Sequence, residues 1–201
     1  MHIVICPGIH SHEATQQFLA ALESCFQAHR LCIMPDRFFP GFAFPVFSGW
    51  HVFQHIEHTL GTPAHTPGSL LFLGFSAGVV GALGAAHLWQ SMGGRVAAFI
   101  AIDGWGVPLW GNFPIHRLSH DHFTQWSSAL MGAGDSAFYA EPSVEHLELW
   151  RSPQIATGYW HASPHAQPFP IPPDQLGPIT AAQVIQTLVQ HYADADRQPS
   201  S

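Results

Sequence analysis

The segment that most constrains the fold of this chain is a Gly-Phe-Ser-Ala-Gly pentapeptide at residues 74–78. It follows the apolar run 70–73 and precedes 79–86, a stretch of glycine, alanine and aliphatic residues. This order predicts a buried strand that turns sharply into a helix, with Ser76 at the corner. Glycines on both sides suit such a turn, because strand and helix close on each other there and leave little space for side chains. The alternative interpretation is an ordinary tight turn of an α/β domain.

Strand-like and helix-like segments alternate along the rest of the chain. Apolar runs predict strands at 2–6, 31–34 and 96–102, with weaker strands at 126–131 and 154–160. Helices are predicted at 14–29, 50–60 and 141–151, and from Thr180, where Gln183 completes a capping-box pattern. Such alternation is typical of a parallel sheet covered by helices on both faces. We therefore expect an α/β fold, a three-layer α/β/α sandwich with a mostly parallel sheet of about six strands.

The length of 201 residues is sufficient for one domain with a sizeable core. The chain contains no internal repeat and no convincing domain boundary. We expect a single domain over residues 1–193 and a frayed tail at 194–201.

Charge and hydrophobicity narrow the range of partners. Only 9% of the residues are charged, and the formal net charge is -7 with six arginines and no lysine. A chain without a basic face is an improbable nucleic-acid binder, so we expect no nucleic-acid partner. Hydrophobic residues make up 47% of the chain, so exposed apolar patches are expected, which suit an apolar substrate. No run reaches the roughly 18 apolar residues of a membrane span.

The cysteines indicate a reducing environment. Cys6, Cys25 and Cys32 are an odd set without the spacing of a disulfide framework, so we expect reduced thiols. The chain starts directly with the predicted strand 2–6, and we expect no signal peptide before it. Both observations favour a cytoplasmic location. The sequence does not indicate an oligomeric state.

With its pentapeptide and its order of elements, nearly the whole chain resembles the α/β-hydrolase family, in a small form without a large cap domain. In that family the G-x-S-x-G turn is the nucleophile elbow, and the catalytic serine, acid and histidine follow in that order along the chain. The resemblance implies a serine hydrolase, esterase-like or thioesterase-like, that cleaves a small or medium acyl ester through an acyl-serine intermediate without a cofactor. Ser76 has the position of the nucleophile.

Two aspartates are candidates for the acid. Asp135 comes after the weak strand 126–131 and is favoured, because the family places its acid at the end of a late strand. Asp103 directly follows strand 96–102 and is the alternative, since some hydrolases place the acid one strand earlier. Either residue could instead be an ordinary helix or turn cap.

The base is expected after the last strand. A serine hydroxyl becomes a strong nucleophile when an imidazole takes its proton, and a carboxylate must orient that imidazole. His161 directly follows the predicted strand 154–160 and is favoured over His165, and His120 and His122 rank behind these two. The chain has sixteen histidines, and most are expected to be surface or structural residues. If no competent base is present, the alternative function is a non-catalytic, hydrolase-like binding or scaffold protein.

The oxyanion of the reaction needs backbone N–H donors. The N–H group of Ala77, at the start of the helix, is one expected donor. The second is expected from the loop after the first strand, from Ile9 or His10. That loop reads Pro-Gly-Ile-His where many relatives have a histidine-glycine pair.

The substrate is expected to contact Phe75, Trp105 and Trp110. The irregular, apolar segments 38–50 and 104–113 follow strand ends, so they should lie at the carboxyl side of the sheet, where ligands bind in α/β folds. The alternative is that their aromatic residues only cap the core.

Clusters of histidine raise the possibility of a metal site. His51, His55 and His58 have the spacing of one helix face, and 10–13 and 120–122 are rich in ligand-type side chains. Three imidazoles on one face can bind zinc, but a polar helix face explains the same spacing. We expect no metal.

Overall fold

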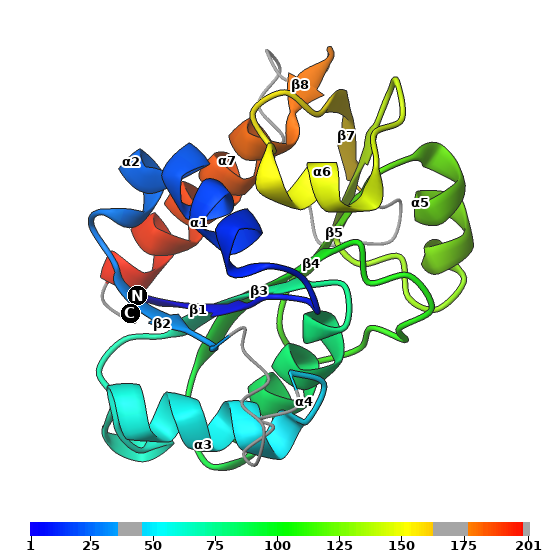
Figure 1. The fold of residues 1–201 in the computed structure, drawn as a ribbon. Coiled ribbons are helices and arrows are strands. Elements are labelled where there is room, and N and C mark those ends of the chain that lie inside the picture. The colour runs from blue at the N-terminus through cyan, green and yellow to red at the C-terminus, as the bar shows by residue number, and fades with distance from the viewer. Residues whose placement is uncertain (36–45, 163–176, 199–201) are drawn as a thin grey trace.

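The computed structural model describes residues 1–35, 46–162 and 177–198. In these ranges the strands form one sheet of eight, in the order β2-β1-β3-β4-β5-β6-β7-β8 (Figure 1). The strands are β1 (His2–Cys6), β2 (Arg30–Ile33), β3 (Leu70–Phe75), β4 (Val96–Ile102), β5 (Ile115–Ser119), β6 (Ser136–Ala140), β7 (Thr157–Ala162) and β8 (Ile179–Thr180). Strands β1 to β6 pair in parallel, and β7 and β8 are antiparallel additions at one edge. The predicted α/β class is confirmed, and the sheet has more strands than the expected six.

Helices cover both faces of this sheet. They are α1 (His12–Ala21), α2 (Glu23–Phe26), α3 (Gly49–Leu60), α4 (Gly78–Ser91), α5 (His122–Ala129), α6 (His146–Arg151) and α7 (Ala181–Arg197), with a short 3₁₀ turn at Pro63–His65. In Figure 1, α1, α2 and α7 lie on one side of β1 and β3, whereas α3 and α4 lie on the other. Within the described residues, no helix combines the length and apolar character that crossing a membrane requires.

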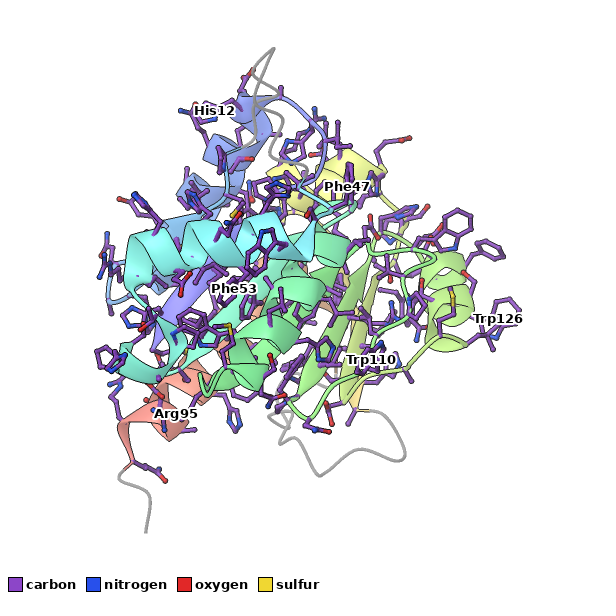
Figure 2. The ribbon with its side chains drawn as sticks, turned by 90° about the horizontal axis from the view of Figure 1, so that it is seen from below. His12, Phe47, Phe53, Arg95, Trp110 and Trp126 are labelled. Carbon is purple, nitrogen blue, oxygen red and sulfur yellow. The ribbon has the colours of Figure 1, made fainter. Side chains whose placement is uncertain are left out.

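Alternating side chains of the central strands build a core on each face. Successive residues of a strand point to opposite faces. Ile3 and Leu71 therefore join one hydrophobic cluster together with side chains of α1, α6 and α7. Val4 and Phe72 join a second cluster together with side chains of α3 and α4, among them Phe53 (Figure 2). The continuous apolar runs of β1, β3 and β4 follow from this burial on both faces.

Strands β5 and β6 were not predicted, and the segment 126–131 was wrongly predicted as a strand. Most of that segment belongs to α5, which Asp121 caps by accepting the backbone N–H of Thr124 at 2.6 Å. Strand β5 is buried throughout although it contains His116 and Arg117. Arg117 donates to the carbonyl oxygens of Gly132 and Val107, so its buried charge meets hydrogen-bond acceptors.

The last helix extends into the segment 194–201, for which the sequence predicts a frayed tail. Helix α7 starts at the predicted capping box, which the structure confirms, and it continues to Arg197. Asp196 forms an ion pair with the amino group of Met1 at 2.8 Å and another with Arg95 at 3.1 Å. Residues 199–201 lie outside the described residues.

A buried polar network joins β5, β6 and α7. The two ring nitrogens of His116 lie 2.7 Å from the hydroxyl oxygens of Ser136 and Tyr192. The indole N–H of Trp160 donates to the same Ser136 hydroxyl at 2.9 Å. Burial, with a smaller contribution from His191, lowers the pKa of His116 to about 3. The native protein therefore keeps this imidazole neutral in mildly acidic solution.

This network predicts that the free energy of unfolding falls as the pH decreases below about 6.5. The unfolded chain binds a proton at His116 near pH 6.5, whereas the native state does not until about pH 3, so protonation favours unfolding between these values. We expect a loss of about 2 kcal/mol between pH 6.5 and 5 from this residue. Urea denaturation of the native protein and of His116→Gln at both pH values measures it. Equal pH dependence in the two proteins would refute the prediction.

Candidate active site

The carboxyl ends of three neighbouring parallel strands meet at one edge of the sheet. Ser76 directly follows β3, Asp103 directly follows β4, and His120 directly follows β5. A cavity of about 640 Å³ opens at this edge and is lined by Ser76, Ala77, Val80, Asp103, Trp105, Val107, His120, Asp121, Phe123, Thr124 and His146. Ligands of open α/β folds bind outside the carboxyl ends of the strands, so this cavity is the candidate active site.

Ser76 has the strained backbone that the pentapeptide predicts. Its φ angle is 53°, in the left-handed region that residues other than glycine seldom adopt. The turn passes directly from β3 into α4, and a Cβ atom at Gly78 would collide with the carbonyl oxygens of Cys6 and Pro7. Glycine at this position therefore lets the first turn of α4 pack against the end of β1, with the Ser76 side chain in the cavity wall.

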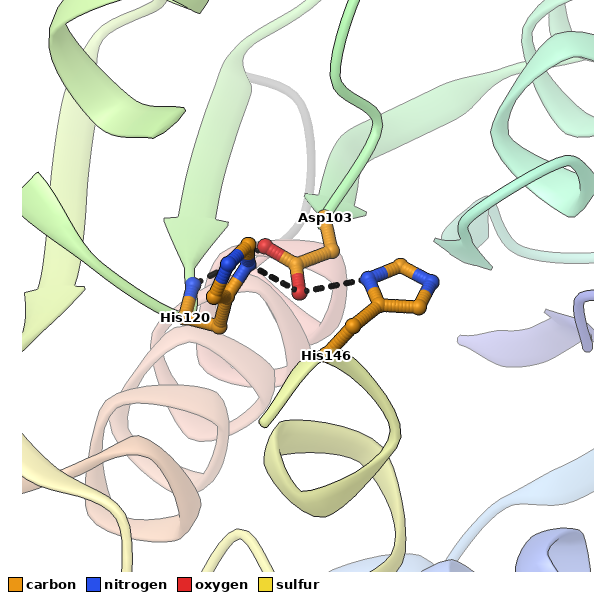
Figure 3. Close-up of side chains that lie close together, drawn as sticks. All are labelled: Asp103, His120 and His146. Atoms are coloured by element: carbon orange, nitrogen blue, oxygen red, sulfur yellow. Dashed lines mark hydrogen bonds and ion pairs between the residues drawn. The ribbon is translucent and has the colours of Figure 1, made fainter. Parts of the chain in front are cut away.

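Asp103 is the centre of the polar groups in the cavity. Its backbone is also in the left-handed region, with a φ angle of 50°, and the residue is only 3% exposed. Its Oδ2 atom lies 2.9 Å from Nδ1 of His120 and 2.9 Å from Nδ1 of His146, and its Oδ1 atom accepts the backbone N–H of His120 (Figure 3). A carboxylate oxygen only accepts, so both Nδ1 atoms carry the hydrogen. The Nε2 atom of each neutral ring is then left as an acceptor.

The His146 ring is held from two sides. It is the first residue of α6, which follows β6, and Asp103 binds its Nδ1 atom. Its ring stacks on Phe75 with centroids 4.8 Å apart, and Phe75 directly precedes Ser76. Phe75 in turn stacks on Trp150, and Trp150 stacks on Phe18 of α1 at 3.7 Å. The imidazole thus stands between a buried carboxylate and a column of packed aromatic rings.

His120 is a second imidazole on the same carboxylate. Its hydrogen bond to Asp103 raises the pKa of His120, while burial acts in the opposite direction. Its Nε2 atom lies 3.6 Å from Oδ2 of Asp121. A charged His120 would form an ion pair with the Asp103 carboxylate.

The two favoured triad partners of Ser76 lie elsewhere. Asp135 precedes β6, at the amino end of that strand, and its carboxylate accepts the backbone N–H of Ile115 at 2.7 Å. His161 pairs with Ala137 near the same end of β6, on the antiparallel strand β7. Neither residue lines the cavity around Ser76. The structure instead brings Ser76 together with the alternative acid Asp103 and with His120, whereas His165 lies outside the described residues.

His146 was not among the predicted site residues because strand β6, which precedes it, was not predicted. The base was expected after the last strand, and the last predicted strand was the antiparallel β7. The last parallel strand is β6, and His146 follows it within one short loop. The available signal was a histidine just after a run of small and aromatic residues, 136–140.

The expected oxyanion-hole residues are partly placed beside Ser76. Ala77 lines the cavity and stands at the N-terminus of α4. The loop after β1 passes directly against the serine, because a Cβ atom at Gly8 would lie 2.9 Å from the Cβ atom of Ser76. Ile9 and His10 follow Gly8 in this loop, and a backbone donor from either of them stays a prediction.

The three expected substrate contacts have different positions. Trp105 lines the cavity. Phe75 is 1% exposed and belongs to the core, where it supports His146. Trp110, labelled in Figure 2, stacks on His87 at 4.1 Å. It lines another cavity, which Asp135 also lines. Residues 36–45, which include most of the apolar segment 38–50, lie outside the described residues.

Asp103, His120 and His146 are also the residues that could hold a metal ion. In the described part of the chain, they are the group of three in which one potential ligand atom per residue lies within 4.8 Å of the others. The helix-face histidines expected as an alternative are engaged with protein groups: His51 contacts the Ser48 hydroxyl and His55 the Ile33 carbonyl. A metal at Asp103 would replace the two Nδ1 hydrogens that now bind Oδ2.

Comparison with known proteins assigns no family to this chain. No protein-family model and no curated protein sequence matches it. The functional interpretation therefore depends on the geometry of the cavity.

Proposed function

We propose that this protein is a serine hydrolase of the α/β-hydrolase type that cleaves small or medium acyl esters or thioesters, with Ser76, His146 and Asp103 as its triad. The observation that carries the proposal is the hydrogen bond from His146 Nδ1 to the buried Asp103 carboxylate, in a cavity that Ser76 also lines. Ser76 follows β3, Asp103 follows β4 and His146 comes after β6, so the three residues have the order serine, acid, histidine, as in the family that the sequence resembles. The helices and hydrophobic clusters on both faces of the sheet support the three-layer arrangement of that family.

Each residue then has a defined step. Ser76 Oγ attacks the carbonyl carbon while His146 Nε2 takes the hydroxyl proton, and Asp103 stabilises the imidazolium that forms. The negative charge on the carbonyl oxygen develops near the Ala77 N–H group, at the positive end of the α4 dipole. His146 returns its proton to the leaving alcohol or thiol, which departs and leaves an acyl-serine. A water molecule, deprotonated by the same nitrogen, then releases the acid and restores the hydroxyl.

Labelling with a fluorophosphonate probe tests the proposal. An activated serine forms an O–P bond as the P–F bond breaks and fluoride leaves, so the native protein should gain one probe at Ser76, located by peptide mass spectrometry. The Ser76→Ala variant should gain none. Absence of labelling in folded native protein would contradict the proposal.

A non-catalytic binding protein is the second candidate, favoured by the same three ligand atoms within 4.8 Å. If Zn²⁺ were coordinated by the Nδ1 atoms, each neutral ring would carry its hydrogen on Nε2, and His146 could not accept the serine proton. Stoichiometric zinc in untagged protein, together with failure to label, would favour this candidate.

A further inference from the structure

We propose that the cavity around Ser76 selects esters with an uncharged, apolar acyl chain, which packs on Trp105 and Phe123, and that Asp121 rejects anionic acyl chains. This inference rests on the proposed hydrolase function and specifies its substrate class.

The apolar wall comes from three separate elements. Val80 belongs to α4, Trp105 and Val107 to the segment after β4, and Phe123 to α5. Val80, Trp105 and Phe123 are 43%, 65% and 62% exposed, so large apolar side chains border the serine without being covered by protein. A bound acyl chain would remove this surface from water. Each methylene group that is fully buried would increase the affinity for the ester about three- to fourfold.

Trp105 is fixed in position rather than loosely exposed. Its indole N–H donates to the hydroxyl of Ser127 at 3.1 Å, which ties the segment after β4 to α5. The two sides of the apolar wall are therefore linked to each other. A preformed wall of this kind loses little conformational freedom when a ligand binds.

The charges of the cavity oppose a negative ligand. Among the described residues, the lining includes two carboxylates, Asp103 and Asp121, and no arginine, and the chain contains no lysine. Asp103 is occupied by the two imidazoles and is buried. Asp121 is partly exposed at the cavity, and of its two oxygens Oδ1 caps α5. In the described part of the lining, the groups that can carry a positive charge are the imidazoles of His120 and His146, and an imidazole is neutral in alkaline solution.

The strength of this selection follows from Coulomb's law. A carboxylate at the end of an acyl chain that lies about 6 Å from Asp121 would bind about tenfold more weakly than a methyl group at an effective dielectric constant near 40. The carboxylate also lacks the apolar contacts that the methyl group would make with the cavity wall, and this weakens its binding further. We expect the difference to shrink at high salt, because the cavity is open to solvent and its charges are screened.

A matched pair of substrates tests whether Asp121 rejects anionic acyl chains. The 4-nitrophenyl ester of pentanoic acid and the mono-4-nitrophenyl ester of glutaric acid have the same leaving group and the same number of acyl carbons, but end in a methyl group and a carboxylate. At low salt, and at a pH well above the histidine range, native kcat/KM should be at least about tenfold higher for the pentanoate. In Asp121→Asn the ratio of the two kcat/KM values should fall about tenfold, and asparagine keeps the helix cap. Asp194→Asn, which removes an exposed charge from α7, should leave the ratio unchanged.

A second pair of variants tests whether an apolar acyl chain packs on Phe123. Phe123 and Trp126 both lie on α5, but Trp126 projects away from the body of the molecule and does not line the cavity (Figure 2). Phe123→Ala should reduce the preference for hexanoate over acetate esters by about tenfold, whereas Trp126→Ala should keep it.

The outcomes separate the inference from the proposed function. Ser76 labelling together with equal rates for the pentanoate and glutarate esters, or an unchanged ratio in Asp121→Asn, would overturn the inference and leave the hydrolase function intact. Failure to label Ser76 and to cleave either ester would overturn the proposed function, and the inference with it.

Discussion

The His146→Ala variant should hydrolyse esters with a kcat/KM at least about a thousandfold below that of the native protein, and its fluorophosphonate labelling should slow by a similar factor. The reason is that His146 lines the Ser76 cavity, donates to Asp103 and stacks on Phe75, the residue before Ser76, whereas the Nε2 atom of His120 lies 3.6 Å from the Asp121 carboxylate. Without it the serine proton has no positioned base. Initial rates with a 4-nitrophenyl ester and gel-based labelling with the probe would measure both effects.

His161→Ala is the matched control for this experiment. His161 lies on β7 near the amino end of β6, away from the cavity, so its loss should change kcat/KM by less than about twofold. If His161→Ala lost activity and His146→Ala kept it, the assignment of the base would be wrong.

The second large effect is expected for Asp103→Asn, which should lower kcat by about 10⁴-fold while the fold is retained. Asparagine tolerates the left-handed backbone of this position, where φ is 50°. Its amide offers one oxygen to two imidazole N–H groups, and its NH₂ group favours the His146 tautomer with hydrogen on Nε2. That tautomer cannot accept the serine proton. Steady-state kinetics on protein with native-like circular dichroism would measure the loss.

Asp135→Asn provides the comparison for the acid. The asparagine oxygen can still accept the Ile115 N–H that Asp135 binds at 2.7 Å, so both fold and rate should stay close to native. The reverse result, an active Asp103→Asn and an inactive Asp135→Asn, would restore the interpretation that the sequence favoured.

The parts of the fold that could be predicted from sequence are those with a strong local pattern. Strand β4 is a continuous apolar run, α4 is a run of small residues after the glycine-rich turn, and α7 begins with a capping box. These patterns are strong because the segments are buried on both faces or capped by their own side chains. The position of Ser76 followed from the same local chemistry.

Strand β5 could not be predicted in this way because tertiary contacts stabilise its polar residues. His116 finds its partners on β6 and α7, and Arg117 on two loops. Distant partners leave no periodic signal in the sequence. With β5 and β6 missing from the predicted order, Asp135 was assigned to a strand end when it lies at a strand start.

The direction of strand pairing also limited the prediction of the catalytic base. Strand β7 is recognisable as an extended segment, but nothing local shows that it runs antiparallel to β6. Because β7 runs antiparallel to β6, His161 near the carboxyl end of β7 lies beside the amino end of β6, at the edge of the sheet opposite to Ser76. Asp103 kept its place among the candidates because β4 was predicted correctly.

The stack of rings that runs from Phe18 through Trp150 and Phe75 to His146 gives the interior a direct influence on the cavity. The orientation of the imidazole depends on side chains of α1 and α6 that no ligand would touch. If the packing between α1 and α6 loosened, the stacked rings would shift and the orientation of the His146 imidazole would change, even with every residue around the serine unchanged.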